Sequence, residues 1–245
     1  MSARVLVTGA HRGIGAACAL AYARAGARVA LADIRRPEDT ARSAKAAGAA
    51  EVLDLACDVA DERTVDAIGQ AVKGAFGGLD ILVHCAGVIH EAPLLDTPIA
   101  DFDRVIAVNL RGSFLVGKMA LGLMAGTAED PARAILIASD MAYYGRETFS
   151  PYVASKHGVL GLVRSWAREF APRILVNAIC PGPIDTEMLG AANMSAEWRA
   201  RELAIPLARF GQPQEIGALA LFLGGDGGRY FTGQGISPNG GSVMP

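Results

Sequence analysis

Short runs of Val, Ile and Leu alternate with longer alanine-rich stretches along almost the whole chain of 245 residues. The short runs are continuous and apolar, which is typical of parallel strands covered on both faces, and the longer stretches have the period of helices. Repeated alternation of this kind predicts β-α-β units. We therefore expect a doubly wound α/β fold of the Rossmann type, a parallel sheet of about seven strands with helices on both faces.

The same pattern gives approximate bounds for the individual strands and helices. It predicts strands at Arg4–Thr8, Arg28–Asp33, Glu51–Cys57, Ile81–Cys85, Ala134–Ser139, Ile174–Ile179 and Gly235–Ser237. It predicts helices at Gly13–Ala25, Asp61–Phe76, Ile99–Ala125, Tyr152–Ala171 and Pro213–Leu223. Right-handed crossovers bring the carboxyl ends of parallel strands to one edge, so we expect ligands there. Because 51% of the residues are apolar, one substantial core can form, and we expect a single domain over residues 1–245.

Charge and hydropathy argue against nucleic-acid and membrane partners. The formal net charge is −2 and the arginines are scattered, so no basic surface is predicted. The start of the chain lacks the charged segment, apolar stretch and cleavage site of an export signal. The apolar stretch near Phe114–Ala125 is interrupted by Lys118 and is too short to cross a bilayer. We expect a soluble cytoplasmic protein.

Cysteine and histidine spacing predicts neither disulfides nor a metal site. The four cysteines lie far apart, with no Cys-x-x-Cys pair, and each falls within an apolar strand or helix pattern. Buried free thiols in a reducing cytoplasm are the expected state. The four histidines form no pair at ligand spacing. We therefore predict no catalytic metal.

A glycine-rich turn joins the first predicted strand to the first predicted helix, with Gly9, Gly13 and Gly15 in the order Gly-x-x-x-Gly-x-Gly. Gly9 allows a sharp turn, Gly13 the close approach of a ligand, and Gly15 close packing of helix on strand. The free N–H groups of the helix start should bind a pyrophosphate, with Arg12 and Ile14 also contacting the cofactor. The spacing differs from Gly-x-Gly-x-x-Gly, so by itself it also fits a tight turn in any α/β domain.

Asp33 ends the second predicted strand, where its carboxylate can accept hydrogen bonds from the adenosine ribose. That carboxylate would repel a 2′-phosphate, which favours NAD over NADP. Arg12, Arg35 and Arg36 lie close enough in the sequence to keep NADP open as the alternative. A carboxylate that only caps a turn is the other interpretation of Asp33.

Two further strand ends carry residues suited to the rest of a dinucleotide. Asp58 and Val59 follow the third predicted strand, where they could bracket an adenine ring. Ala86 and Gly87 follow the fourth, where small side chains would admit the nicotinamide ribose.

Tyr152 and Lys156 stand four residues apart, which places them on one face of a helix, and Ser139 precedes Tyr152 by thirteen residues. An ammonium beside the phenol should lower the Tyr152 pKa from its ordinary value of about 10. Tyr152 could then serve as general acid and base. Isolated Tyr-x-x-x-Lys pairs are more often ordinary amphipathic helix starts. Lysine, however, accounts for only four of the 23 basic residues, so arginine supplies most of the positive charge. This favours a specific role for the Lys156 ammonium.

Together these residues make the chain resemble the short-chain dehydrogenase/reductase family over essentially its whole length. The shared features, in the family's order and separations, are Thr8–Gly15, Asp58, Ala86, Gly87, Asn109, Ser139, Tyr152, Lys156, Pro181, Gly182 and Thr186. The resemblance implies that Tyr152 is the proton donor and acceptor and that Ser139 hydrogen-bonds the reacting oxygen. It implies that Lys156 lowers the Tyr152 pKa and holds the ribose.

The resemblance also implies roles for the remaining positions and a quaternary structure. Asn109 would interrupt a long helix and anchor a water beneath Lys156, and a homotetramer is expected. The nicotinamide would be covered by Pro181, Gly182, Ile184 and Thr186. The chain departs from the family at His84-Cys85, where two asparagines are usual, and at Ala138, where a second serine is common. The change at position 84 puts the hydrogen bonds between strands in doubt.

The implied activity is an NAD(P)-dependent oxidoreductase that interconverts a secondary alcohol and a ketone. Residues 183–206 are predicted to form a substrate lid, with an ordinary surface helical hairpin as the alternative. Polar residues in the expected pocket favour a polyol, sugar or other small hydroxylated substrate; they are His90, Glu91, Tyr143, Tyr144 and Arg146. The alternatives are a 3-oxoacyl-thioester reductase that uses NADPH, and a dinucleotide-sensing protein without catalysis.

Overall fold

The computed structural model describes residues 2–244. Its centre is a parallel sheet in the order β3-β2-β1-β4-β5-β6-β7. The strands are β1 (Arg4–Thr8), β2 (Arg28–Asp33), β3 (Glu51–Ala56), β4 (Ile81–His84), β5 (Ala132–Ile137), β6 (Ile174–Ile179) and β7 (Gly235–Ile236). Strand order reverses between β1 and β4, so the topological switch point falls there.

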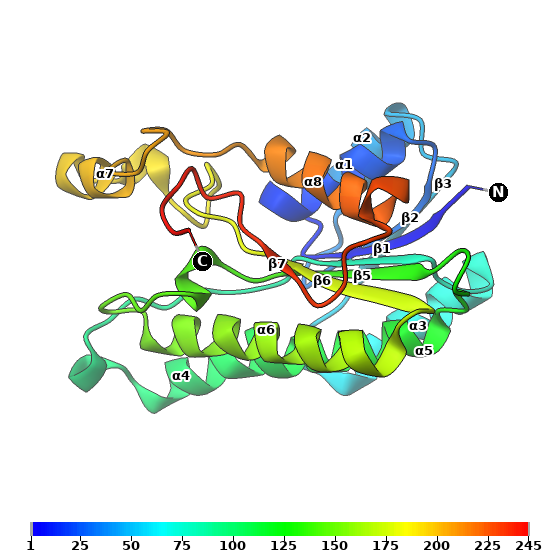
Figure 1. The fold of residues 1–245 in the computed structure, drawn as a ribbon, viewed down its shortest axis with the longest axis horizontal. Coiled ribbons are helices and arrows are strands. Elements are labelled where there is room, and N and C mark those ends of the chain that lie inside the picture. The colour runs from blue at the N-terminus through cyan, green and yellow to red at the C-terminus, as the bar shows by residue number, and fades with distance from the viewer. Residues whose placement is uncertain (1, 245) are drawn as a thin grey trace.

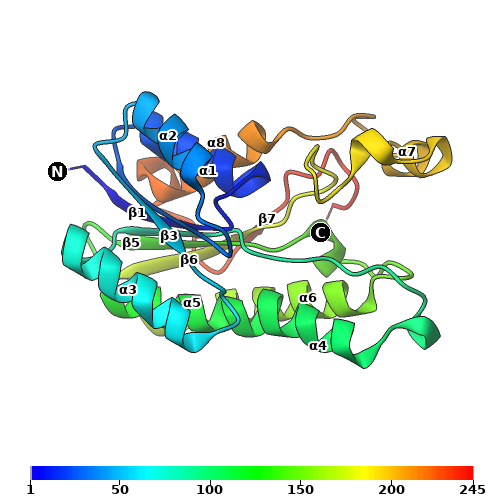
Figure 2. The same ribbon diagram turned by 180° about the vertical axis from the view of Figure 1, so that it is seen from behind.

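Helices cover both faces of the sheet (Figures 1 and 2). One face carries α1 (Gly13–Arg24), α2 (Glu38–Ala46) and α8 (Pro213–Gly224). The other carries α3 (Glu62–Phe76), α4 (Ile99–Ile106), α5 (Gly112–Leu123) and α6 (Ser150–Phe170). The short helix α7 (Ala196–Glu202) lies beyond the carboxyl ends of the strands, at the left of Figure 1. The predicted doubly wound, single-domain fold is confirmed.

Alternating side chains of β1 divide the core into two layers. Leu6 packs into the layer formed with α3, α5 and α6, whereas Val5 and Val7 pack into the layer formed with α1 and α8. A shift of one residue would exchange the layers, so burial on both faces fixes the register. In this register Thr8 lies opposite Ala32 on one side and His84 on the other, and the strands therefore end at a common edge.

The strand predictions hold to within two residues, and those for β1, β2 and β6 have the observed bounds. Two helices, α2 and α7, were not among the predictions. The buried side chains of α2 are Thr40, Ala41 and Ala44, so no large apolar residue marks its inner face. Helix α7 has no buried residue at all, so neither helix has a strong apolar period to detect.

The helix predicted over Ile99–Ala125 consists of α4, a π-helical turn at Ala107–Arg111 and α5. The π turn contains Asn109. The continuous stretch Ile99–Leu123 is long and apolar enough to cross a membrane by length and composition. The stretch near Phe114–Ala125 is too short to cross a bilayer, but this reasoning does not apply to the whole helix. Half of its most apolar window is buried within the protein, and it packs against α3 and α6, as expected of a core helix.

Helix packing on this face depends on glycine. A Cβ built on Gly117 of α5 would lie 2.2 Å from the indole of Trp166 on α6, and one on Gly158 would lie 2.8 Å from Leu110. Contacts this close leave no room for a methyl group, so α5 and α6 approach through their glycines.

We predict that Gly117→Ala lowers the free energy of unfolding by about 1–2 kcal/mol, because overpacking against Trp166 outweighs the higher helix propensity of alanine. Urea unfolding measures the change. The matched control is Gly122→Ala on the same helix, where a Cβ meets nothing within 4 Å. That variant should be unchanged or more stable by up to about 1 kcal/mol. Equal stability of the two variants would contradict the packing argument.

Candidate active site

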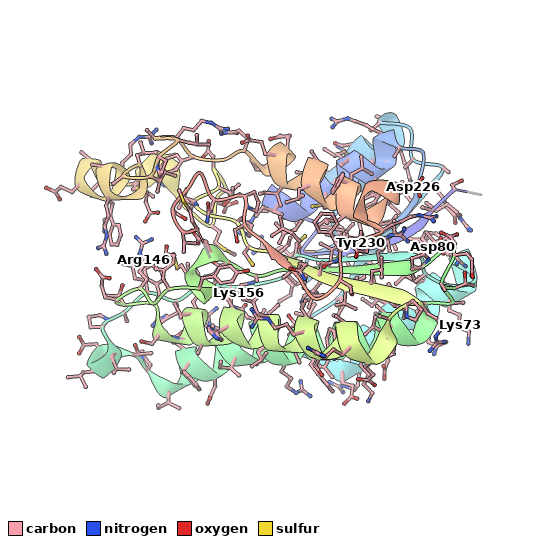
Figure 3. All side chains as sticks on the ribbon, viewed as in Figure 1. Lys73, Asp80, Arg146, Lys156, Asp226 and Tyr230 are labelled. Carbon is pink, nitrogen blue, oxygen red and sulfur yellow. The ribbon has the colours of Figure 1, made fainter. Side chains whose placement is uncertain are left out.

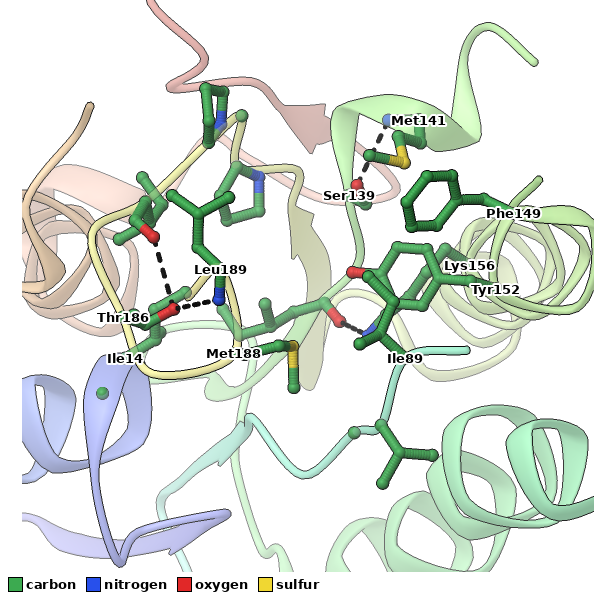
Figure 4. A pocket seen from close by; sticks show the side chains of 18 of the residues that line it. Ile14, Ile89, Ser139, Met141, Phe149, Tyr152, Lys156, Thr186, Met188 and Leu189 are labelled. Carbon is green, nitrogen blue, oxygen red and sulfur yellow. Dashed lines mark hydrogen bonds between the residues drawn. The ribbon is translucent and has the colours of Figure 1, made fainter. Parts of the chain in front are cut away.

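A cavity of about 870 Å³ opens at the carboxyl edge of the sheet, which is within the size range of ligand sites. Figure 4 shows part of its lining from close by. Its walls come from the β1–α1 turn, the ends of β2 to β6, the start of α6 and the segment from residue 181 to residue 205. The cavity therefore lies where doubly wound sheets bind ligands.

The glycine-rich turn packs directly on the end of β4. Gly9 and Gly13 have φ of +65° and +58°, the left-handed region that favours glycine. A Cβ on Gly9 would lie 2.6 Å from the Ala86 nitrogen, and one on Gly15 would lie 2.0 Å from the Gly9 carbonyl oxygen. No side chain caps the start of α1, whose N-cap residue is Arg12. The first N–H groups of α1 thus fit a pyrophosphate.

The residues predicted to hold the adenosine lie at the ends of β2 and β3, but they do not all face the cavity. Asp33 lines it and accepts a hydrogen bond from the His11 N–H at 3.0 Å, so its carboxylate also stabilises the turn. Val59 lines the cavity as well. Asp58 accepts a hydrogen bond from the Ala60 N–H at 2.9 Å and is not part of the lining.

Asn109 holds the loop that follows β4. Its amide donates to the Val88 carbonyl at 2.9 Å, and its Oδ1 accepts from the Val88 N–H at 2.8 Å. The amide also donates to Ser155 Oγ at 3.0 Å, which joins the loop to α6. A Cβ on Gly87 would lie 3.3 Å from Asn109 Oδ1 and 3.4 Å from Lys156 Nζ. Asn109 is fully buried behind the cavity wall.

The three side chains predicted to carry the chemistry share one wall of the cavity. In Figure 4, Ser139 and Tyr152 face the same space and Lys156 lies behind Tyr152. Ser139 Oγ accepts a hydrogen bond from the Met141 N–H at 3.2 Å, which fixes its position after β5. Lys156 Nζ donates to the Ile137 carbonyl at 2.8 Å and lies 5.7 Å from the centre of the Tyr152 ring.

Burial dominates the ionisation of this pair. It raises the pKa of Tyr152 to about 12, and a hydrogen bond with Ser139 only partly opposes the shift. It lowers the pKa of Lys156 to about 8. The expected lowering of the Tyr152 pKa by Lys156 is therefore wrong for the protein alone. Nζ lies over the ring and is hydrogen-bonded to Ile137, so its charge does not offset the desolvation of the phenol.

His84 makes the link between strands that the sequence put in doubt. Its Nδ1 lies 2.7 Å from Thr8 Oγ1, and both side chains are buried. Burial lowers the pKa of His84 to about 3, so the ring is neutral at physiological pH. Thr8 Oγ1 also accepts from the Ala86 N–H at 3.5 Å. The His84 ring thus joins β1 to β4 next to the glycine-rich turn.

The segment after β6 forms the side of the cavity opposite α6. Ile184 is buried and pairs with Gly211 in an isolated bridge, while the Thr186 hydroxyl donates to the Ile184 carbonyl at 3.2 Å. Glu187 forms an exposed ion pair with Arg12 of the glycine-rich turn. This pair connects the two segments that line the cofactor end of the cavity, which also include Pro181 and Gly182.

The far end of the cavity is closed by an ion pair that the sequence analysis missed. Arg146, after β5 and labelled in Figure 3, pairs with Glu202 of α7, and the two side chains are only 10% and 11% exposed. The guanidinium also stacks on Phe149 and Trp198, each ring centre 5.1 Å away. Five polar residues were expected in this region, and three of them line the cavity: Glu91, Tyr144 and Arg146.

The other two expected residues, His90 and Tyr143, are not in the lining and are engaged elsewhere. His90 lies 3.7 Å from Asp101, and the Tyr143 hydroxyl donates to the Gly235 carbonyl at 3.0 Å. Asp140, which also lines the cavity, is buried directly after Ser139.

Sequence and structure comparisons identify proteins that are similar to this chain over nearly its whole length. The sequence model described as enoyl-(acyl carrier protein) reductase matches residues 9–242. The 3-oxoacyl-(acyl-carrier-protein) reductase of Thermotoga maritima is 36% identical, over 98% of this chain and 97% of its own length. The D-threitol dehydrogenase of Mycolicibacterium smegmatis is 38% identical, over 98% of this chain and 92% of its own length. A short-chain dehydrogenase from Burkholderia cenocepacia was solved in complex with NADP. It superposes with a TM-score of 0.89 at 32% identity, over 98% of this chain and 97% of its own chain.

We predict that Lys156→Met raises the free energy of unfolding at pH 7, because the fold no longer has to bury an ammonium. The fall in the Lys156 pKa from 10.5 to about 8 corresponds to about 3 kcal/mol, the upper limit of the gain. Between pH 8 and 10.5 the unfolded chain binds more protons than the native protein, so wild-type stability should rise there and the difference should shrink. Urea unfolding at pH 7 and pH 10 measures both effects. The control is Lys118→Met at an exposed position of α5. Its difference in stability from the wild type should be the same at pH 7 and pH 10.

Proposed function

Because this chain belongs to the short-chain dehydrogenase/reductase family and is an oxidoreductase, we propose that it interconverts a secondary alcohol and a ketone by hydride transfer with a nicotinamide dinucleotide. One observation carries the proposal. Ser139, Tyr152 and Lys156 line the same cavity as the uncapped start of α1. A phenol, a hydroxyl and an ammonium beside a helix start that can bind a pyrophosphate are the groups that carbonyl reduction requires.

The bound nicotinamide would supply or accept the hydride. In reduction, Tyr152 donates its phenol proton to the carbonyl oxygen, and in oxidation it accepts the proton of the alcohol. Ser139 donates a hydrogen bond to the same oxygen and stabilises the charge that develops on it. Since burial raises the pKa of Tyr152 to about 12, the phenol of the free protein is protonated at neutral pH and prepared for donation. Lys156 would hold the ribose, and Asn109 would keep the adjoining loop in place.

We propose NAD as the preferred cofactor, held by the turn at Gly9–Gly15, by Val59, Ala86 and Gly87, and by the segment from Pro181 to Thr186. The argument depends on Asp33, whose carboxylate lines the cavity and would repel a 2′-phosphate. Two arginines that could bind that phosphate already have acidic partners, since Arg12 pairs with Glu187 and Arg36 lies 3.8 Å from Asp54. The NADP in the Burkholderia cenocepacia structure supports the alternative.

The substrate end of the cavity favours a small hydroxylated substrate such as a polyol or sugar. Glu91, Tyr144, Arg146 and Glu202 place hydrogen-bonding groups around a space next to Ser139. The similarity to D-threitol dehydrogenase supports this class. A 3-oxoacyl thioester is the second candidate, supported by the similarity to the Thermotoga maritima reductase. Spectroscopic assays of polyols, simple ketones and 3-oxoacyl thioesters with each nicotinamide distinguish the two.

The segment 183–206 would act as the lid over this substrate, because it contributes much of the cavity lining, including Met188, Met194 and Trp198. We also propose that the enzyme assembles as a homotetramer. The exposed apolar side chains Ile99, Phe102 and Phe114 on α4 and α5 would be covered in such an assembly.

Asp33→Asn should shift cofactor preference toward NADP by about tenfold in the ratio of kcat/KM values, because it removes the repulsion of a 2′-phosphate. The amide oxygen can still accept the His11 N–H, so the turn should persist. Steady-state rates with both nucleotides measure the ratio. Asp39→Asn, at an exposed position of α2, is the matched control and should leave it unchanged. A wild-type preference for NADP would refute the assignment of NAD.

Tyr152→Phe should abolish turnover, because it removes the only group proposed to move the proton, with a loss of at least about a hundredfold. Nucleotide affinity should persist, since the dinucleotide contacts lie elsewhere in the cavity. Steady-state assays and calorimetric titration with NAD test the two parts separately. Near-normal activity in this variant would exclude the proposed chemistry, and loss of nucleotide binding would indicate a damaged fold.

A further inference from the structure

Asp140 is a buried carboxylate that the proposed chemistry does not use. It is 3% exposed and begins the 3₁₀ turn Asp140–Ala142 directly after Ser139. Its backbone N–H donates to the Pro181 carbonyl at 3.0 Å. Its side chain meets a hydroxyl at each oxygen, since Ser139 donates to Oδ1 at 3.3 Å and Ser242 donates to Oδ2. The carboxylate therefore joins the C-terminal segment to the serine of the active site.

This arrangement determines where the single hydroxyl proton of Ser139 goes. In the protein without substrate, Ser139 Oγ accepts the Met141 N–H, and its own proton points to Asp140 while the carboxylate is ionised. A substrate oxygen has to draw this proton away from Asp140 before Ser139 can donate to it. A phenolate at Tyr152 would need that same proton as a hydrogen bond. Ionised Asp140 thus competes with a Tyr152 phenolate for Ser139, whereas a protonated Tyr152 can donate its own proton to Ser139 Oγ.

Charge acts in the same direction as the competition for the proton. Asp140 raises the pKa of Tyr152 through its negative charge, in addition to the larger effect of burial. Among the described residues, Asp140 has no ion pair with lysine or arginine. The titratable groups that face it from neighbouring elements are Tyr144 of its own loop, Tyr152 of α6, Cys180 after β6 and Glu202 of α7. None of these is a cation, and the nearby Arg146 is paired with Glu202. The cation beside Tyr152 is Lys156, whose Nζ lies 5.7 Å from the ring centre and donates to the Ile137 carbonyl.

We propose that Asp140 is a positioning residue that keeps Tyr152 in its protonated, proton-donating form, by holding the Ser139 proton and by placing a negative charge beside the phenol. The inference rests on the proposed function of Tyr152. Oxidation begins from the phenolate, which Asp140 opposes. Asp140 therefore raises the pH above which the enzyme oxidises alcohols efficiently, in addition to the larger effect of burial.

Asp140→Asn tests the inference, because the amide keeps the size of the side chain and removes its charge. The pH at which kcat/KM for alcohol oxidation rises should fall by about one unit, the lower end of the effect of a neighbouring charge. At a fixed pH below that rise, oxidation should be up to about tenfold faster. The pH above which kcat/KM for reduction declines should fall by the same amount, since both profiles follow the ionisation of the same phenol. As pH falls through the pKa of Asp140, the two proteins should converge.

Ser242→Ala is the matched control. It removes the hydrogen bond from the C-terminal segment but leaves the charge of Asp140 in place, so the oxidation profile should not move to lower pH. An equal downward shift in Ser242→Ala would show that loosening of the C-terminal segment causes the effect, and would overturn the inference. Asp140→Ser, which also removes the charge, replaces Asp140→Asn if the amide variant does not fold.

A second measurement needs no substrate. Ultraviolet difference titration follows phenolate formation, and subtraction of the Tyr152→Phe trace isolates Tyr152 from the other tyrosines. The midpoint for Tyr152 should be lower in Asp140→Asn than in the wild type. An unchanged midpoint, or turnover with an unshifted pH profile, overturns the role proposed for Asp140 and leaves the proposed function intact. Absence of turnover by the wild type with every alcohol and ketone would instead refute the proposed function, whatever the titration shows.

Discussion

Burial of the parallel sheet on both faces is the constraint on which the rest of this structure depends. Successive strands are joined through helical crossovers, so all strands run in one direction and finish at one edge. Because these helices cover both faces, the register cannot slip without exchanging the two core layers. Gly9, Ala86, Ser139 and Pro181, which are far apart in the sequence, are brought to that edge by the ends of β1, β4, β5 and β6. The cavity results from this convergence of strand ends.

The same burial determines the chemistry available at the edge. It raises the pKa of the Tyr152 phenol and lowers that of the Lys156 ammonium to about 8, so burial shifts each group toward its neutral form, while Lys156 remains mostly protonated at pH 7. Lys156 gains one hydrogen bond, to Ile137, in return for losing its hydration. A site of this kind reduces stability, and it becomes favourable only when a ligand interacts with the groups that the fold has desolvated.

Sequence reasoning succeeded where the signal is local and repeated. Continuous apolar runs located the strands within two residues, and the spacing of Tyr152 and Lys156 placed them on one face of α6. It failed where the outcome depends on which way a side chain turns. His90 and Tyr143 are not in the cavity lining, and Lys156 Nζ lies over the Tyr152 ring and donates to the Ile137 carbonyl. Such orientations follow from packing between distant segments, which the order of residues does not reveal.

The two ends of the cavity are built differently, and this difference explains how related enzymes can differ in substrate. The proposed cofactor end consists of strand ends and a glycine turn, where a Cβ on Gly9 or Gly15 would collide with backbone. The proposed substrate end consists of loops joined by side chains, namely Arg146 with Glu202 and Asp140 with Ser242. A substitution there replaces one side-chain contact without moving the sheet. Relatives named for a 3-oxoacyl thioester and for a four-carbon polyol can therefore share one scaffold at 36% and 38% identity to this chain.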